Sequence, residues 1–166
     1  MSAAPVLVLA FGNPGRGDDA LGPMLADRLE DWLAAQGRDD VEVIVDFQLN
    51  IEHALDLADR QRVLFVDARA SGESGARLDA VSARADASYS THAVSPQGLL
   101  AVHEQVIGET PPQAELLSLR GHSFELGDPL TAAARQALEA GWNGLLGWLD
   151  AATCRHEAAH VSSVGQ

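Results

Sequence analysis

Basic side chains are scarce in this sequence. The 166 residues include 11 Lys and Arg against 24 Asp and Glu, which gives a formal net charge of −13 at pH 7. A surface of this sign repels the phosphates of nucleic acids and the headgroups of anionic membranes. We therefore expect neither a nucleic-acid partner nor a membrane partner.

Cysteines and long hydrophobic runs are also lacking. The single cysteine, Cys154, cannot form a disulfide within the chain, which is typical of a reducing compartment. The apolar runs have the length of β-strands, so no transmembrane helix is expected. No basic segment precedes the first run, as it would in a signal peptide. These absences favour a cytoplasmic protein.

The hydrophobic content is sufficient for a packed core. Hydrophobic residues make up 46% of the chain, and its length fits one domain. We expect a single α/β domain over residues 1–152, a flexible C-terminal tail over residues 153–166, and a monomer.

Apolar segments of strand length alternate with segments of helical periodicity. Strands are expected at residues 5–11, 41–47, 62–68 and 114–120, with a weaker edge strand near 77–83, and helices at about 19–36, 50–59, 96–107 and 128–152. Ser95-Pro96 and Asp128-Pro129 each combine a capping residue with a proline, as helix starts often do. The alternation predicts a three-layer α/β sandwich, in which a mostly parallel, twisted sheet of about five strands has helices on both faces.

Three reactive side chains are expected to meet at one edge of this sheet. Ligands of open α/β sheets bind beyond the carboxyl ends of the strands. Asp19 follows the first strand, Asp67 ends the third, and His92 precedes a later helix. Two carboxylates and an imidazole suit a borderline divalent metal such as nickel, zinc or cobalt. Asp46 ends the second strand, but no second ligand-type residue follows it.

The glycine-rich loop at residues 12–17 leaves one alternative open. Such a loop can cradle phosphate in a nucleotide- or metal-binding module that is not an enzyme. Asp18 and Asp19 follow it, however, where a phosphate-binding loop has Lys and Ser or Thr. Either aspartate could instead cap the helix that begins there.

A second alternative lies near the C-terminus. Residues 156–160, HEAAH, match the His-Glu-x-x-His pattern of zinc hydrolases, in which His156 and His160 bind zinc and Glu157 acts as the base. Only six residues follow the motif, so it has no downstream third ligand.

Several motifs along the chain occur together in one known family. They are VLVLAFGNP at residues 6–14, RGDDALG at 16–22, LFVDA at 64–68, TH at 91–92 and FELG at 124–127. In this order they resemble the nickel–iron hydrogenase maturation endopeptidases.

The resemblance implies a cytoplasmic protease of the hydrolase class. It would remove a short C-terminal extension from a hydrogenase large-subunit precursor after nickel has been inserted. By motif, the catalytic and metal-binding positions of the family fall on Asp19, Asp67 and His92. The nickel belongs to the precursor, so the resting enzyme can be metal-free.

One stretch departs from the family pattern. Many members have Asp-Gly-Gly-Thr after the second strand, where this chain has Asp46-Phe47-Gln48-Leu49. The aspartate is kept and the glycines are not. Residues 48–54, QLNIEHA, look more like the enzymes that serve soluble, cofactor-reducing hydrogenases.

Overall fold

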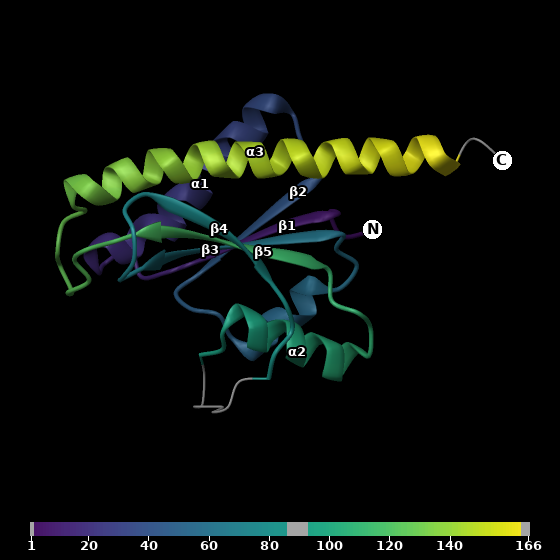
Figure 1. Cartoon of the computed structure of the whole chain (residues 1–166), viewed down its shortest axis with the longest axis horizontal. Coiled ribbons are helices and arrows are strands. Elements are labelled where there is room, and N and C mark those ends of the chain that lie inside the picture. Colours follow the sequence, from purple (N-terminus) through teal and green to yellow (C-terminus); the bar gives the residue numbers. More distant parts are fainter. Residues whose placement is uncertain (1, 86–92, 164–166) are drawn as a thin grey trace.

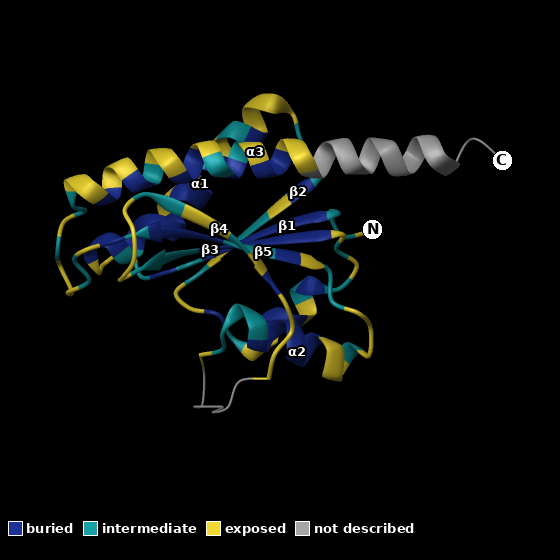
Figure 2. Ribbon diagram, in the orientation of Figure 1, coloured by how far each residue is buried: buried dark blue, intermediate teal, exposed yellow. Residues whose placement is uncertain are grey.

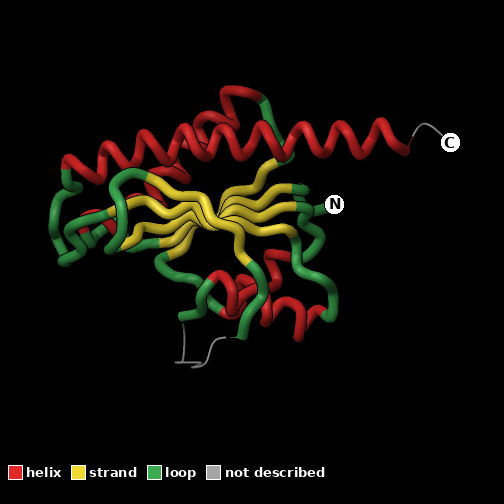
Figure 3. The backbone as a smooth tube through the Cα atoms, in the orientation of Figure 1, coloured by secondary structure: helices red, strands yellow, loops and turns green. Residues whose placement is uncertain are grey.

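A single twisted sheet forms the centre of the molecule. The computed structural model describes residues 2–85 and 93–163, with side chains up to residue 151. The strands of this sheet, drawn yellow in Figure 3, have the order β2-β1-β3-β5-β4 along the hydrogen-bonding direction. Their bounds are β1 Val6–Phe11, β2 Val41–Asp46, β3 Arg62–Arg69, β4 Ala76–Val81 and β5 Gln113–Arg120. All neighbours pair in parallel except β4, which lies antiparallel to β5 at the edge.

Helices cover both faces of the sheet (Figure 1). One face carries α1 (Leu21–Gln36) and α3 (Ala132–Ser163), and the other carries α2 (Pro96–Ile107) and the 3-10 helix η2 (Ile51–Leu57). The predicted three-layer α/β class is therefore confirmed. None of the helices in the described ranges is long and apolar enough to cross a membrane.

The central strands are buried on both sides, as their continuous apolar runs predict. In β1, Leu7 and Leu9 face α2 and η2, while Val8 and Ala10 face α1 and α3. All four side chains are at most 1% exposed. Figure 2 shows these strands as the buried layer between the helices. This rigid layer fixes the positions at which the strands end.

Of the two helix starts that were predicted from a capping residue followed by proline, only one is correct. Ser95 caps α2, because its Oγ accepts the N–H of Gly98 at 3.0 Å. The expected start at Asp128 is wrong. The helix α3 begins after Thr131, whose Oγ1 accepts the N–H of Ala134 at 3.1 Å. The Asp128 carboxylate is instead used within the preceding turn, where it accepts from the Ser123 hydroxyl.

The predicted end of α3 near residue 152 is also wrong, because the backbone stays helical to Ser163. Residues 150–163 contain no glycine or proline that would break a helix. The last buried side chain given for this helix is Leu149. The helical backbone therefore continues well past the predicted end.

Candidate functional site

Two of the three predicted site residues meet where the parallel strands end. This edge lies on the same side of the molecule as the start of α3 (Figure 1). Asp19 lies in the short 3-10 helix η1 (Gly17–Ala20) that follows β1. Asp67 lies two residues before the end of β3. The charge of Asp19 is close enough to affect the pKa of Asp67. The structure thus brings together two carboxylates that are 48 positions apart in the sequence.

Close packing of η1 and α1 on the strand ends holds Asp19 in place. The N–H of Asn13 donates to Asp19 Oδ2 at 2.7 Å. Gly12 has a φ of 150° and touches the carbonyl of Asp19, which leaves no space for a side chain. A Cβ on Gly22 would lie only 2.6 Å from the carbonyl oxygen of Phe11. Gly12 in the loop and Gly22 in α1 therefore allow a close backbone approach that sets the position of Asp19.

The environment of Asp67 favours its protonated form. Burial, and after it the negative charge of Asp19, raise the pKa of this carboxyl to about 7, against an opposing hydrogen bond from the backbone N–H of Ala68. A divalent cation between the two carboxylates would take the place of the proton and remove their repulsion. The pair is therefore suited to a cation that arrives from outside.

His92 lies outside the described residues, so its predicted place beside Asp19 and Asp67 stays a prediction. Within the described part of the chain, no three side chains of His, Cys, Asp or Glu form a group that could hold a metal. The two carboxylates are thus the part of the predicted ligand set that the structure describes.

Asp18 has a different role from its neighbour. Its side chain is fully buried and accepts the N–H groups of His122 at 2.7 Å and of Ser123 at 3.2 Å. It also accepts the N–H and the hydroxyl of Thr131, each at 2.8 Å. The expectation that Asp18 or Asp19 caps the helix after the loop is wrong, because neither side chain caps η1 or α1. Asp18 instead joins η1 to the loop before α3.

These hydrogen bonds determine the charge state of Asp18. Burial alone would raise the pKa of the carboxyl, but the donors from Thr131, His122 and Ser123 outweigh burial and lower it. The two adjacent aspartates thus have separate roles: Asp18 accepts hydrogen bonds from the loop before α3, and Asp19 lies beside Asp67. The sequence could not show this, because Asp18 and Thr131 are 113 positions apart.

Asp46 lies at the same edge and has a partner that the sequence did not reveal. Nε2 of His53 lies 3.3 Å from Asp46 Oδ2. Nδ1 of His53 accepts the N–H of Asn50 at 2.8 Å, so in the neutral ring Nε2 carries the hydrogen that points to Asp46. His53 is only 7% exposed. The carboxylate at the end of β2 is therefore held by a buried histidine of η2.

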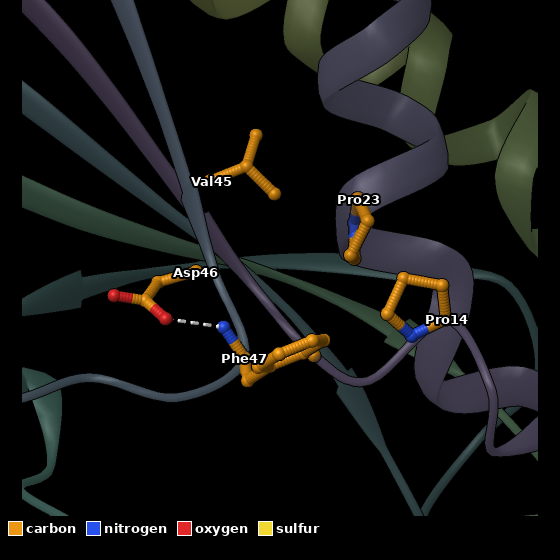
Figure 4. Close-up of a pocket in the computed structure, with 6 residues that line it drawn as sticks. Pro14, Pro23, Val45, Asp46 and Phe47 are labelled. Atoms are coloured by element: carbon orange, nitrogen blue, oxygen red, sulfur yellow. Dashed lines mark hydrogen bonds between the residues drawn. The ribbon is translucent and has the colours of Figure 1, made fainter.

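An apolar cavity of about 180 Å³ lies beside the first loop (Figure 4). Its lining residues are Gly12, Pro14, Pro23, Val45, Asp46 and Phe47. The side chains of Val45, Phe47 and the two prolines surround it, whereas the carboxylate of Asp46 turns away and accepts the N–H of Phe47 (Figure 4). Phe47 is 68% exposed. The cavity offers an apolar surface beside Gly12, which packs against the backbone carbonyl of Asp19.

The glycine-rich loop is poorly suited to binding phosphate. The N–H of Asn13 is used by Asp19, and the N–H of Gly15 donates to the side chain of Asn13 at 2.9 Å. The N–H of Asp18 donates to the carbonyl of Ser123 at 2.8 Å. These donors are therefore engaged within the protein, which counts against the nucleotide-binding alternative.

The HEAAH motif lies in the last turns of α3, where the backbone is helical. The side chains of His156, Glu157 and His160 lie outside the described set. The zinc-hydrolase alternative therefore stays a prediction.

Comparison with known proteins identifies the fold. No family model matches the chain, and no curated protein matches it. Solved structures do match. The hydrogenase maturating endopeptidase HybD from E. coli is 21% identical, with a TM-score of 0.67 over 92% of this chain and 94% of that chain. The chain has the fold of the hydrogenase maturation endopeptidases.

Two archaeal structures support the same assignment of the fold. The [NiFe] hydrogenase maturation protease HycI from Thermococcus kodakarensis is 20% identical, with a TM-score of 0.61 over 84% of this chain and 86% of that chain. The hydrogenase 2 maturation peptidase from a Thaumarchaeota archaeon is 24% identical, with a TM-score of 0.59 over 87% of this chain and 97% of that chain. The likeness extends over nearly the whole length of these proteins.

Proposed function

We propose that this protein is an endopeptidase that removes a short C-terminal extension from a nickel-loaded hydrogenase large-subunit precursor. The observation that carries the proposal is the pair of carboxylates, Asp19 and Asp67, at the carboxyl edge of the sheet. The names of the structural neighbours support the reaction class. The sequence motifs that contain both aspartates support the same class.

In this proposal Asp19, Asp67 and His92 recognise the nickel that the precursor already carries. Two oxygen ligands and one imidazole leave positions open on the metal for the substrate. Nickel polarises the scissile carbonyl or activates a water molecule. The water oxygen then bonds to the carbonyl carbon, the C–N bond breaks, and the leaving nitrogen takes up a proton. The protein works as a cytoplasmic monomer and needs no resident metal.

A cleavage assay followed by mass spectrometry tests the proposal. The purified protein is mixed with precursor that contains nickel and with the same precursor that lacks it. We expect loss of a C-terminal peptide from the nickel-loaded form only. Equal cleavage of both forms would keep the protease and overturn nickel recognition, and cleavage of neither form by the wild-type protein would overturn the proposed function.

Three substitutions test the site itself. We expect Asp19→Asn, Asp67→Asn and His92→Gln each to reduce the rate of cleavage by at least about 100-fold, because each removes a ligand of the reacting metal. Asp27→Asn is the matched control, because Asp27 is an exposed aspartate on α1. Wild-type rates in all three site variants would show that the assignment of the site is wrong.

A further inference from the structure

Two arginines lie side by side at the edge of the sheet that carries the site. Arg69 and Arg120 are the last residues of β3 and β5, and they are register partners. Asp67 precedes Arg69 by two residues, so the alternation of a strand places both on the same face of the sheet. Arg120 shares this face because paired residues of neighbouring strands point to the same side.

The two guanidinium groups lie around one glycine. Nη1 of Arg69 donates to the carbonyl of Ser71 at 2.8 Å and would lie 2.9 Å from a Cβ on Gly72. Nε of Arg120 donates to the carbonyl of Gly72 at 3.1 Å, and its Nη1 donates to the carbonyl of Gly121. Two positive charges are therefore gathered at one loop, where they repel each other.

No carboxylate of the described residues forms an ion pair with this arginine pair. Every permanently positive side chain of this protein is an arginine, because the sequence has no lysine. Among the arginines whose side chains the structure describes, five form ion pairs with Asp or Glu, namely Arg28, Arg38, Arg60, Arg62 and Arg77. Arg69 and Arg120 instead hydrogen-bond to backbone carbonyl oxygens within the described ranges. Both are half-buried, and Nε of Arg69 is buried without a partner there.

Half-buried cations without a counter-charge are costly, and an anionic ligand removes that cost. A guanidinium group fits a carboxylate with two parallel N–H donors. We infer that Arg69 and Arg120 bind a carboxylate on the C-terminal extension of the substrate. This inference rests on the proposed function, because it places the extension beside the metal-binding carboxylates.

The spacing in the strand indicates which part of the extension is bound. Arg69 lies two residues beyond Asp67, a distance of about 7 Å along the strand. An extended peptide advances about 3.3 Å for each residue. The bound carboxylate therefore belongs to about the second or third residue after the cleaved bond. It is either an Asp or Glu side chain or, in a very short extension, the terminal carboxylate.

Steady-state kinetics with the nickel-loaded precursor test the inference. We expect Arg69→Gln and Arg120→Gln each to raise KM by about 10-fold or more while kcat changes by less than about twofold, because the contact lies away from the reacting bond. The matched control is Arg77→Gln, since Arg77 lies on the neighbouring strand and pairs with Asp79. Arg69→Lys and Arg120→Lys keep the charge and are expected to recover part of the affinity.

Both arginines also hold the loop after β3, so the substrate is varied as well. One precursor has amides in place of the acidic side chains at the start of its extension. Another has a run of neutral residues added at its C-terminus, which moves the terminal carboxylate away. An increase in KM of the wild-type protein for either precursor supports the inference and identifies the source of the carboxylate.

The outcomes separate this inference from the proposed function. Cleavage with an unchanged KM for both altered precursors, and for Arg69→Gln and Arg120→Gln, overturns the inference and leaves the proposed function intact. Absence of cleavage by the wild-type protein overturns both.

Discussion

Adjacent aspartates in this protein have opposite electrostatic environments. Asp18 is surrounded by hydrogen-bond donors, which lower its pKa. Asp19 faces another carboxylate, Asp67, whose pKa its charge helps to raise. Neighbouring residues of η1 thus supply a structural carboxylate, Asp18, and a carboxylate of the candidate site, Asp19. We therefore expect substitutions at Asp18 and at Asp67 to change stability in opposite directions.

Replacement of Asp18 by Asn is expected to destabilise the fold by about 2–4 kcal/mol at pH 7. The amide loses the charge and turns a donor toward the N–H groups that Asp18 accepts. The folded-state pKa of Asp18 lies below 3.8. The wild-type protein is therefore more stable than the variant above about pH 4, and this difference is lost as the pH falls through the folded-state pKa. Urea unfolding at pH 7 and pH 3 measures both effects. Equal stabilities at pH 7 would contradict the assigned role of Asp18.

Replacement of Asp67 by Asn is expected to have the opposite effect. The folded-state pKa of Asp67 is raised from 3.8 to about 7. The contribution of the protonated Asp67 side chain to folding stability is therefore complete below about pH 4 and is lost as the pH rises through about 7. The neutral amide should therefore raise the free energy of unfolding at pH 8, by up to about 4 kcal/mol, and have little effect at pH 4. Unfolding of both proteins at the two pH values measures this. A destabilised variant at pH 8 would show that the pair is not strained by repulsion.

The candidate site was only partly predictable at this scale. Asp19 and Asp67 could be placed at one edge because Asp19 follows a recognisable strand and Asp67 lies near the end of another. The pairing of His53 with Asp46 and of Asp18 with Thr131 depends on side-chain geometry across separate elements. A sequence pattern carries no signal for such contacts.

At the scale of elements, the strands were more predictable than the helix ends. Continuous apolar runs located β1 and β3 within about one residue, because burial on both faces makes the central residues of these strands apolar without alternation. The starts of α1 and α3 were misplaced because Asp19 and Asp128 hydrogen-bond within loops instead of capping a helix. These two side chains thus hydrogen-bond to loop residues, although their local sequence favours a helix cap.

Two glycines of the helices make a matched pair of substitutions. Gly22→Ala places a Cβ 2.6 Å from the carbonyl of Phe11, so we expect a loss of about 1–3 kcal/mol and reduced cleavage, since α1 and Asp19 must move. Gly147 in α3 has open space around it. We expect Gly147→Ala to stabilise the protein by about 0.5–1 kcal/mol. Thermal unfolding and the cleavage assay distinguish the two, and equal effects would contradict the close packing of α1.

Deletion of residues 155–166 tests the last turns of α3. The described side chains of this helix that are buried, the last of which is Leu149, are retained. We expect wild-type cleavage of the precursor and a Tm within about 2 °C of the intact chain. Loss of activity in a folded, truncated protein would support the zinc-hydrolase alternative with His156, Glu157 and His160.

At the scale of the whole molecule, the charge of −13 opposes compaction. Salt screens this repulsion, because the Debye length falls to about 10 Å at 0.1 M ionic strength. We expect an increase of NaCl from about 0.05 M to about 0.3 M to raise Tm at pH 8 by about 2–4 °C. The increase should shrink at pH 5, close to the sequence pI of about 4.6. A fall in Tm with salt at pH 8 would show that attractive pairs dominate.

The fold class was the most predictable property of this protein. Alternation of strands and helices is a feature of the whole chain, and local errors at helix ends do not alter it. The antiparallel edge strand β4 was also expected at the sheet margin.

The hydrogen bonds of Asp18 also bear on the order of events during synthesis. Their acceptor emerges early from the ribosome, whereas their donors at His122 and Thr131 follow more than a hundred residues later. Contacts of such long range close a large loop and form late in folding. The turn that presents Asp19 is therefore completed only when most of the chain has been made. A nascent fragment that ends before α3 has the first carboxylate of the site but not the support that fixes it, so the site is completed only with the finished domain.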